Sequence, residues 1–225
     1  MQISINSHSS IWVDDMVFDP YNISGNECKI FDTKKEKLLD EKVKIDGSKK
    51  AKYVLLTHTH YDHLSIEDLS KIIDNDTVII ATPDAKTELE KNFKNNDKFF
   101  IRPNEAMELD GITISTISSY NLNKDFHKKE FGWVGYKVTK NDETFAVVGD
   151  TDATPELENL TCDILFVPIG GTYTMTAEEA SNVTNKINPK IAIPTHYGSI
   201  VGSKSDAEIF VKNLNKNITP VVLID

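Results

Sequence analysis

The sequence predicts an α/β protein in which two β-sheets pack face to face and helices cover their outer faces. Three observations lead to this prediction. Short apolar runs that are typical of strands recur along the whole chain, and helical patterns occur between them. The 225 residues are enough to bury a full core. No low-complexity linker divides them, so we expect a single domain spanning residues 1–225.

The expected elements follow from these patterns in chain order. Strands are predicted at 2–6, 10–13, 16–19, 28–32, 53–57, 77–81, 99–101, 112–118, 133–139, 144–149, 163–168, 190–194 and 219–224. Helices are predicted at 65–73, 83–94, 176–187 and 204–214. Ser65 with Asp68 three residues later resembles a helix N-cap, and Thr176 with Glu179 has the pattern of a capping box.

Charge and composition narrow the class of partner. The net charge is −10, from 35 acidic and 25 basic residues, which argues against a broad nucleic-acid surface. Cys28 and Cys162 are far apart and follow no metal-binding spacing, and this low cysteine usage fits a reducing cytoplasm. The first six residues read as a polar-alternating strand, not as a signal peptide, and no apolar run approaches a membrane span. We therefore expect a cytoplasmic protein with a small-molecule substrate, and the sequence does not specify an oligomeric state.

Residues 57–63 read Thr-His-Thr-His-Tyr-Asp-His and hold three of the six histidines of the chain. The segment follows an apolar run and precedes a predicted helix, so it forms a strand-to-helix loop, where α/β folds build sites. On extended backbone, His58 and His60 point to the same face and can hold one ion. Asp62 and His63 follow the turn and could bind a second ion. Imidazole and carboxylate together suit zinc, with iron or manganese as alternatives.

Further candidate ligands lie in the second half of the chain. His196 follows a β-branched predicted strand and is either a ligand or a hydrogen-bonded core histidine. Asp150 ends another predicted strand, where a carboxylate can bridge two cations or cap a turn, and Asp152 competes with it for the bridging role. His127 lies in a charged loop, so it is either a ligand or a solvated surface histidine.

These segments together resemble the metallo-β-lactamase superfamily of hydrolases. The matching pieces, in the order of that superfamily, are His58-x-His60-x-Asp62-His63, His127, Gly149-Asp150-Thr151 and Pro194-Thr195-His196-Tyr197-Gly198. The segments Ser7-His8-Ser9-Ser10, Phe18-Asp19-Pro20 and 168–175 are most similar to small stand-alone members related to L-ascorbate-6-phosphate lactonase and N-acyl phosphatidylethanolamine phospholipase D. The resemblance covers nearly the whole chain. It implies a four-layer αββα sandwich of two mixed sheets, with metals at one edge between them.

The resemblance also implies a binuclear metal centre. The first metal site would consist of His58, His60 and His127, the second of Asp62, His63 and His196, with Asp150 as the bridge between the ions. Members of the superfamily with a redox di-iron site typically carry an acid at the position of His60. The resemblance therefore favours two Zn²⁺ ions and hydrolysis, with Mn²⁺ or Fe²⁺ as alternatives.

The expected activity is hydrolysis of a small ester, lactone or phosphoester by a metal-bound hydroxide. Asp62 could orient this hydroxide, and the leaving group could be protonated by His8, Tyr173 or Tyr197; Asp62 and His8 are the predicted catalytic residues. The predicted substrate contacts are Tyr120, Thr172, Tyr173 and Tyr197. Asp19 either holds a ligand imidazole or forms a simple turn. Two alternative functions are a nuclease or phosphodiesterase of the same superfamily, which the acidic charge disfavours, and a metal-binding regulatory protein with degenerate catalysis.

Overall fold

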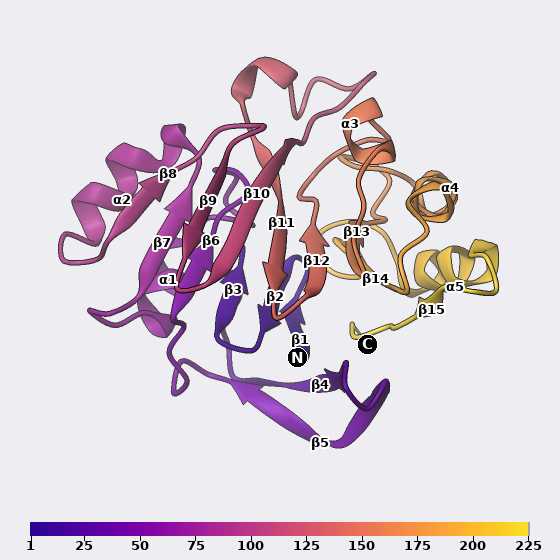
Figure 1. Ribbon diagram of the computed structural model, residues 1–225. Coiled ribbons are helices and arrows are strands. Elements are labelled where there is room, and N and C mark those ends of the chain that lie inside the picture. The colour runs from indigo at the N-terminus through magenta and orange to yellow at the C-terminus, as the bar shows by residue number, and fades with distance from the viewer. Residues whose placement is uncertain (225) are drawn as a thin grey trace. The chain divides into compact units, whose positions relative to one another are not determined.

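The computed structural model describes residues 1–224 and divides into two compact units (Figure 1). The first unit comprises residues 1–101 together with Ile224, and the second comprises residues 102–223. Each unit contains one β-sheet in which some neighbouring strands run antiparallel and others run parallel. Both sheets are therefore mixed, as the resemblance to the superfamily implies.

The sheet of the first unit has eight strands in the order β5-β4-β1-β2-β3-β6-β7-β8. Their bounds are β1 (Gln2–Ser7), β2 (Ser10–Val13), β3 (Met16–Phe18), β4 (Asn26–Asp32), β5 (Lys37–Ile45), β6 (Tyr53–Leu55), β7 (Val78–Ala81) and β8 (Lys98–Phe100). Strands β3, β6, β7 and β8 run parallel to one another, so their carboxyl ends meet at one edge. At this edge the Asp19 N–H donates to the Leu55 carbonyl at 3.1 Å. The pairing of β3 with β6 thus sets Asp19 beside the segment 57–63.

Helices connect the parallel strands of the first unit and cover part of its sheet (Figure 1). They are α1 (Ile66–Ile72), the 3-10 helix η1 (Pro83–Ala85) and α2 (Lys86–Asn92). Leu69 and Ile72 of α1 and Leu89 of α2 are fully buried in one apolar cluster with Val54 and Ile79 of the sheet. Burying a Leu or Ile side chain contributes roughly 1.5–3 kcal/mol, so these three residues anchor both helices.

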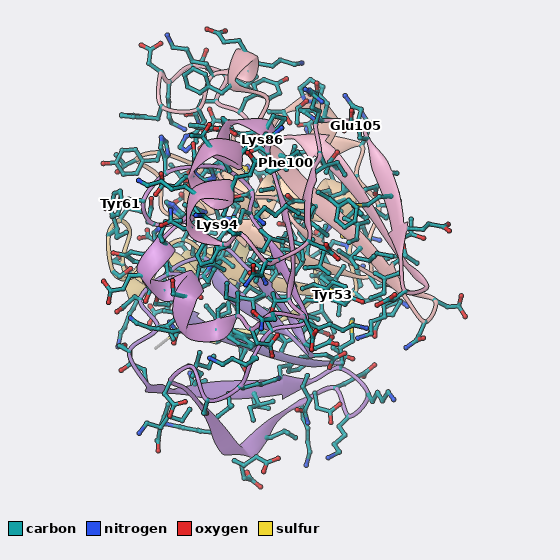
Figure 2. The ribbon with its side chains drawn as sticks, turned by 90° about the vertical axis from the view of Figure 1, so that its left-hand side faces the viewer. Tyr53, Tyr61, Lys86, Lys94, Phe100 and Glu105 are labelled. Carbon is teal, nitrogen blue, oxygen red and sulfur yellow. The ribbon has the colours of Figure 1, made fainter. Side chains whose placement is uncertain are left out.

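Local contacts at the ends of these helices agree with the sequence patterns. The Ser65 side chain accepts a hydrogen bond from the Asp68 N–H at 3.2 Å, which confirms the predicted N-cap of α1. At the start of α2, Lys86 lies over Phe100 of β8, with its Nζ 5.8 Å from the ring centre (Figure 2). This cation–π contact joins α2 to the strand that follows it.

The sheet of the second unit has seven strands in the order β15-β14-β13-β12-β11-β10-β9. Their bounds are β9 (Ala106–Leu109), β10 (Ile112–Ser118), β11 (Val134–Lys140), β12 (Glu143–Val147), β13 (Ile164–Pro168), β14 (Ile191–Thr195) and β15 (Thr219–Pro220). Strand β11 is antiparallel to both β10 and β12, and β12, β13 and β14 are parallel. Consequently β10, β12, β13 and β14 all run in one direction. The loops that follow these four strands share one edge of the sheet and carry His127, Asp150, Gly170 and His196.

Helices of the second unit are η2 (Lys129–Phe131), α3 (Pro155–Glu158), α4 (Ala177–Ile187) and α5 (Lys204–Asn213). The predicted capping box of α4 is confirmed, because the Thr176 side chain accepts from the Glu179 N–H and the Glu179 carboxylate accepts from the Thr176 N–H. Helix α4 packs against α5 and β13, with Ala180 and Val183 buried. None of the helices in the described residues has the length and apolar character that a membrane span requires.

The sequence patterns missed strands β5 and β9, helix α3 and the three-residue 3-10 helix η2, and several predicted elements are longer than those observed. Strands β5 and β9 are edge strands with mostly exposed or half-buried side chains, so they lack the apolar run that marks a buried strand. Helix α3 is only four residues long, too short for a helical periodicity. The predicted helix at 83–94 begins as a 3-10 turn and ends at Asn92, and the predicted strand at 219–224 is limited to β15.

Candidate metal centre

The loop between β6 and α1 brings the four predicted ligands of the first unit together. The His58 Nε2 and His60 Nδ1 atoms are 3.2 Å apart, and the ring centres of His58 and His63 are 4.0 Å apart. Asp62 Oδ2 lies 3.8 Å from His63 Nε2. Tyr61, between these ligands in sequence, is 66% exposed and lies at the surface (Figure 2). In this loop the histidine and aspartate side chains are therefore buried or half-buried, whereas the tyrosine side chain is exposed to solvent.

Asp19 and Thr57 hold two of these imidazoles in a fixed orientation. The Asp19 carboxylate accepts from His63 Nδ1 at 2.8 Å, from the Thr57 N–H at 2.8 Å and from the Thr57 hydroxyl at 2.7 Å. Because the Thr57 hydroxyl proton goes to Asp19, its oxygen accepts from His58 Nδ1, 3.0 Å away. Both histidines therefore carry their proton on Nδ1. Each presents Nε2, the nitrogen with the lone pair, as the atom that can bind a cation.

His8 lies against the same ligand set. Its Nε2 is 3.1 Å from Asp62 Oδ2, and the side chain is only 1% exposed. The donor atoms of His8, Asp62 and His63 lie within 4.8 Å of one another, close enough to hold one ion. The structure thus places His8 directly on the predicted catalytic carboxylate, where it can orient Asp62 or exchange a proton with it.

Three of the candidate residues have left-handed backbone conformations that L-residues seldom adopt. The φ angles are +49° at His8, +45° at Asp19 and +56° at His196. Such a conformation costs roughly 1–3 kcal/mol when the side chain is not glycine. The surrounding fold therefore compensates for strain at these positions, as it often does where a side chain must be aimed at a ligand.

In the second unit, two buried imidazoles converge on one carboxylate oxygen. His127 Nε2 is 3.3 Å and His196 Nε2 is 2.9 Å from Asp150 Oδ2, and all three residues are no more than 4% exposed. Asp152, the competing candidate, instead forms an ion pair with Lys124 at 2.5 Å. Asp150 is therefore the carboxylate that faces the histidines, and Asp152 has a structural partner of its own.

Asn121 fixes His127 in the same way that Asp19 fixes His63. Its Oδ1 accepts from the His127 N–H and from His127 Nδ1, each at 3.1 Å. A backbone N–H can only donate, so the atom facing it is the amide oxygen, and His127 carries its proton on Nδ1. The Asn121 Nδ2 donates to Asp152 at 3.2 Å and to the Tyr173 carbonyl at 2.8 Å. His127 is thus a buried, oriented imidazole and not the solvated surface histidine that its charged neighbours suggest.

The residues predicted to contact substrate occupy different environments. Thr172 is exposed and Tyr173 is half-buried, whereas Tyr197 is only 1% exposed. Tyr120 is 8% exposed, and its hydroxyl donates to Glu156 at 2.9 Å. Of the four, Thr172 and Tyr173 are the most accessible to a substrate.

Sequence reasoning missed two residues that organise the candidate ligands. Thr57 directly precedes His58 at the end of a buried run, and a polar residue at that position is a usable signal. Asn121 lies six residues before His127 in a loop of irregular structure, and no local pattern links the two. Its role depends on how the loop folds back, which periodicity does not report.

The family model of the Beta-lactamase superfamily domain matches residues 18–197, which is most of the chain. A fold with two mixed sheets and clustered histidines and aspartates at strand ends agrees with that match. The chain belongs to the metallo-β-lactamase superfamily, and its fold class is the one predicted from the sequence.

Similar proteins within the superfamily identify a narrower family. A UPF0173 metal-dependent hydrolase of Thermoplasma acidophilum is 32% identical over 168 residues, which cover 70% of this chain and 70% of the relative. A UPF0173 protein of Pyrococcus abyssi is 29% identical over 213 residues, covering 89% of this chain and 93% of the relative. The solved structure of Igni18, a metallo hydrolase from Ignicoccus hospitalis, matches with a TM-score of 0.70 at 18% identity, and the match covers 98% of this chain and 94% of that chain. The relatives define the UPF0173 metal-dependent hydrolases as the family, and the solved structure supports the fold.

Proposed function

We propose that this protein is a binuclear zinc hydrolase that cleaves a small ester, lactone or phosphoester. The observation that carries the proposal is the hydrogen bonding of three imidazoles. His58, His63 and His127 each direct Nδ1 toward a fixed acceptor, so each offers Nε2 for metal binding. A surface histidine has no need of such an arrangement, whereas a metal ligand requires one tautomer and one ring orientation.

The donor chemistry of each unit fits transition-metal binding. Imidazole nitrogens with one or two carboxylates are the ligand types of catalytic zinc sites, and Mn²⁺ or Fe²⁺ are accepted by the same set. We assign His58, His60 and His127 to one ion, Asp62, His63 and His196 to the other, and Asp150 to the bridge. The convergence of His127 and His196 on Asp150 Oδ2 supports the bridging role.

The residues of this chain would perform distinct tasks in the reaction. Bound zinc would supply Lewis acidity and lower the pKa of a ligated water to about 7. Asp62 would orient the attacking water through its carboxylate. His8, at 3.1 Å from Asp62 Oδ2, would hold that carboxylate and deliver a proton from Nε2 to the leaving group. The alternatives for this proton are Tyr173 and Tyr197.

Two finer proposals follow from the sequence. The motifs around His8, Asp19 and Tyr173 support a closer relationship to L-ascorbate-6-phosphate lactonase and N-acyl phosphatidylethanolamine phospholipase D than to other superfamily members. A cytoplasmic location is supported by two cysteines that are both free.

Metal analysis combined with a substrate panel tests the proposal. The protein is purified without chelators, supplemented with zinc and dialysed, and its metal content is measured by mass spectrometry. We expect about two zinc ions per chain, in keeping with a two-metal site. Lactones, carboxylic esters and phosphodiesters are then assayed. His60→Ala should lower both the zinc content and the turnover of the best substrate, while Lys94→Ala, an exposed residue of the first unit, should leave both unchanged (Figure 2).

The outcomes separate the competing functions. Zinc content below one ion per chain would reject the binuclear centre. Full zinc content without hydrolysis of any substrate class would favour the metal-binding regulatory protein. Preferential cleavage of phosphodiesters would favour the nuclease or phosphodiesterase alternative.

A further inference from the structure

We infer that an aromatic wall on the second unit selects substrates with a neutral alkyl or aryl group. The wall consists of the exposed Phe126 and Phe131, the half-buried Tyr173 and the buried Trp133, whose ring contacts both Phe131 and His127. This inference rests on the proposed function and deepens it, because it names the kind of substrate that the metal site would hydrolyse.

Exposed apolar side chains are concentrated in one loop. Among the described residues, six large apolar side chains are exposed, and three of them lie within ten positions of one another. These three are Leu122, Phe126 and Phe131, at 51%, 46% and 44% exposure. Single exposed apolar residues are ordinary, whereas a cluster on one short segment marks a surface that binds something.

The aromatic wall adjoins a predicted metal ligand. The Trp133 ring lies edge-on to the His127 ring at 5.4 Å, and the Phe131 ring lies 4.9 Å from Trp133. Phe126 directly precedes His127 in the chain and contacts Tyr173 edge to face at 4.7 Å. An apolar group that extends from the reacting centre at His127 would therefore meet aromatic rings.

Polar contacts of the loop tie it to neighbouring segments of the second unit. Asp152 accepts from the Leu122 N–H at 2.9 Å and pairs with Lys124. Lys124 also donates to the Thr174 carbonyl at 2.8 Å, and Asn121 donates to the Tyr173 carbonyl. These bonds tie the start of the loop to the segment that carries Tyr173, so Phe126 and Tyr173 are presented by ordered backbone. A preformed apolar surface loses little conformational entropy when it binds a ligand.

The charges of the loop favour a neutral group over a phosphate. Each of its three lysines faces an acid: Lys124 pairs with Asp152 at 2.5 Å, Lys129 with Glu156 at 2.7 Å and Lys128 with Asp125 at 3.7 Å. A phosphate site would instead gather cations around one point. The apolar wall thus points to carboxylic esters, thioesters or lactones with an alkyl or aryl substituent.

Binding of two zinc-chelating probes tests the wall without relying on turnover. The affinities of acetohydroxamate and hexanohydroxamate for the zinc-loaded protein are measured by calorimetry. We expect the hexanoyl probe to bind at least about tenfold more tightly, since each buried methylene favours binding. Phe126→Ser should reduce this ratio to about twofold or less without changing zinc content. Phe99→Ser serves as the matched control, because Phe99 is similarly exposed, at 42%, on β8 of the first unit.

A ratio near one in the unaltered protein, or the same ratio in Phe126→Ser as in Phe99→Ser, would overturn the inference and leave the zinc hydrolase intact. A chain that binds no zinc would overturn both. Hydrolysis provides a second readout: kcat/KM should rise from acetate to hexanoate esters through KM, and Phe126→Ser should flatten this trend.

Discussion

Asp19 accepts a hydrogen bond from Nδ1 of His63 at 2.8 Å, and both side chains are fully buried. The same carboxylate binds the Thr57 hydroxyl, which in turn accepts from His58 Nδ1. One buried acid therefore sets the tautomers of two predicted ligands in the first unit. The strained backbone at Asp19 and the pairing of β3 with β6 place the carboxylate within hydrogen-bond distance of both His63 and Thr57.

Removing this carboxylate should weaken metal binding. We expect Asp19→Ala to lower zinc affinity by about 10–100-fold, the usual loss when a residue that orients a metal ligand is removed. Asp19→Asn should lose less, because an amide oxygen still accepts from His63 and Asn tolerates a positive φ. Competition with a fluorescent chelator measures the affinities. Equal affinity of the Ala variant and the parent would contradict the role of Asp19.

Asn121 should affect zinc binding through His127, a predicted ligand in the second unit. In Asn121→Leu, His127 loses the acceptor that holds its Nδ1 proton, so we expect about tenfold weaker binding of one of two zinc ions. Asn123→Ala, an exposed residue of the same loop, is the control and should bind zinc like the parent. Calorimetric titration of zinc into the apoprotein resolves the two binding events. If the binding of both zinc ions weakened equally, Asn121 would support the fold and would not act on His127 in particular.

Gly170 allows the backbone to approach His196 closely. A Cβ added at Gly170 would clash with the His196 carbonyl oxygen and would lie 2.6 Å from Val201 Cγ2 and 3.2 Å from His196 Nδ1. We expect Gly170→Ala to destabilise the protein by about 1–3 kcal/mol through overpacking and to weaken zinc binding, because His196 must move. At Gly111 an added Cβ meets no atom within 4 Å, but φ is +76°, so Gly111→Ala should lower stability through backbone strain and leave zinc binding unchanged. Urea denaturation and zinc titration of both variants check this difference.

Much of this arrangement could be predicted from the sequence because it is local. The spacing of His58, His60, Asp62 and His63 after a buried strand indicates a metal-binding loop, and strand ends indicate where Asp150 and His196 lie. By contrast, β5 and β9 carry no apolar run, since edge strands need bury little. Asn121 acts through the fold of an irregular loop. Sequence patterns report burial and spacing along the chain, whereas contacts made by loops depend on tertiary structure.

The amino ends of three strands in the second unit meet at Asp163, whose charge should contribute to stability. Its carboxylate accepts from the Thr144 N–H at 2.8 Å and the Thr144 hydroxyl at 2.7 Å, and Lys190 lies 2.8 Å away. Burial, the largest single influence, raises the pKa of Asp163. The bonds from Lys190 and Thr144 outweigh it and lower the pKa from 3.8 to about 2.

Because the pKa of Asp163 is lower in the folded state than in the unfolded state, its contribution to stability is present above about pH 4 and is lost as the pH falls toward 2. We expect Asp163→Asn to lower the free energy of unfolding by about 1–2 kcal/mol at pH 7. The difference from the parent should shrink between pH 4 and 2. Lys190→Ala should cost less than about 0.5 kcal/mol, since the Lys190 side chain is 81% exposed and the pair is screened by solvent. Urea denaturation across this pH range measures all three proteins. A gap between Asp163→Asn and the parent that stays constant down to pH 2 would show that packing, and not the charge, makes Asp163 stabilising.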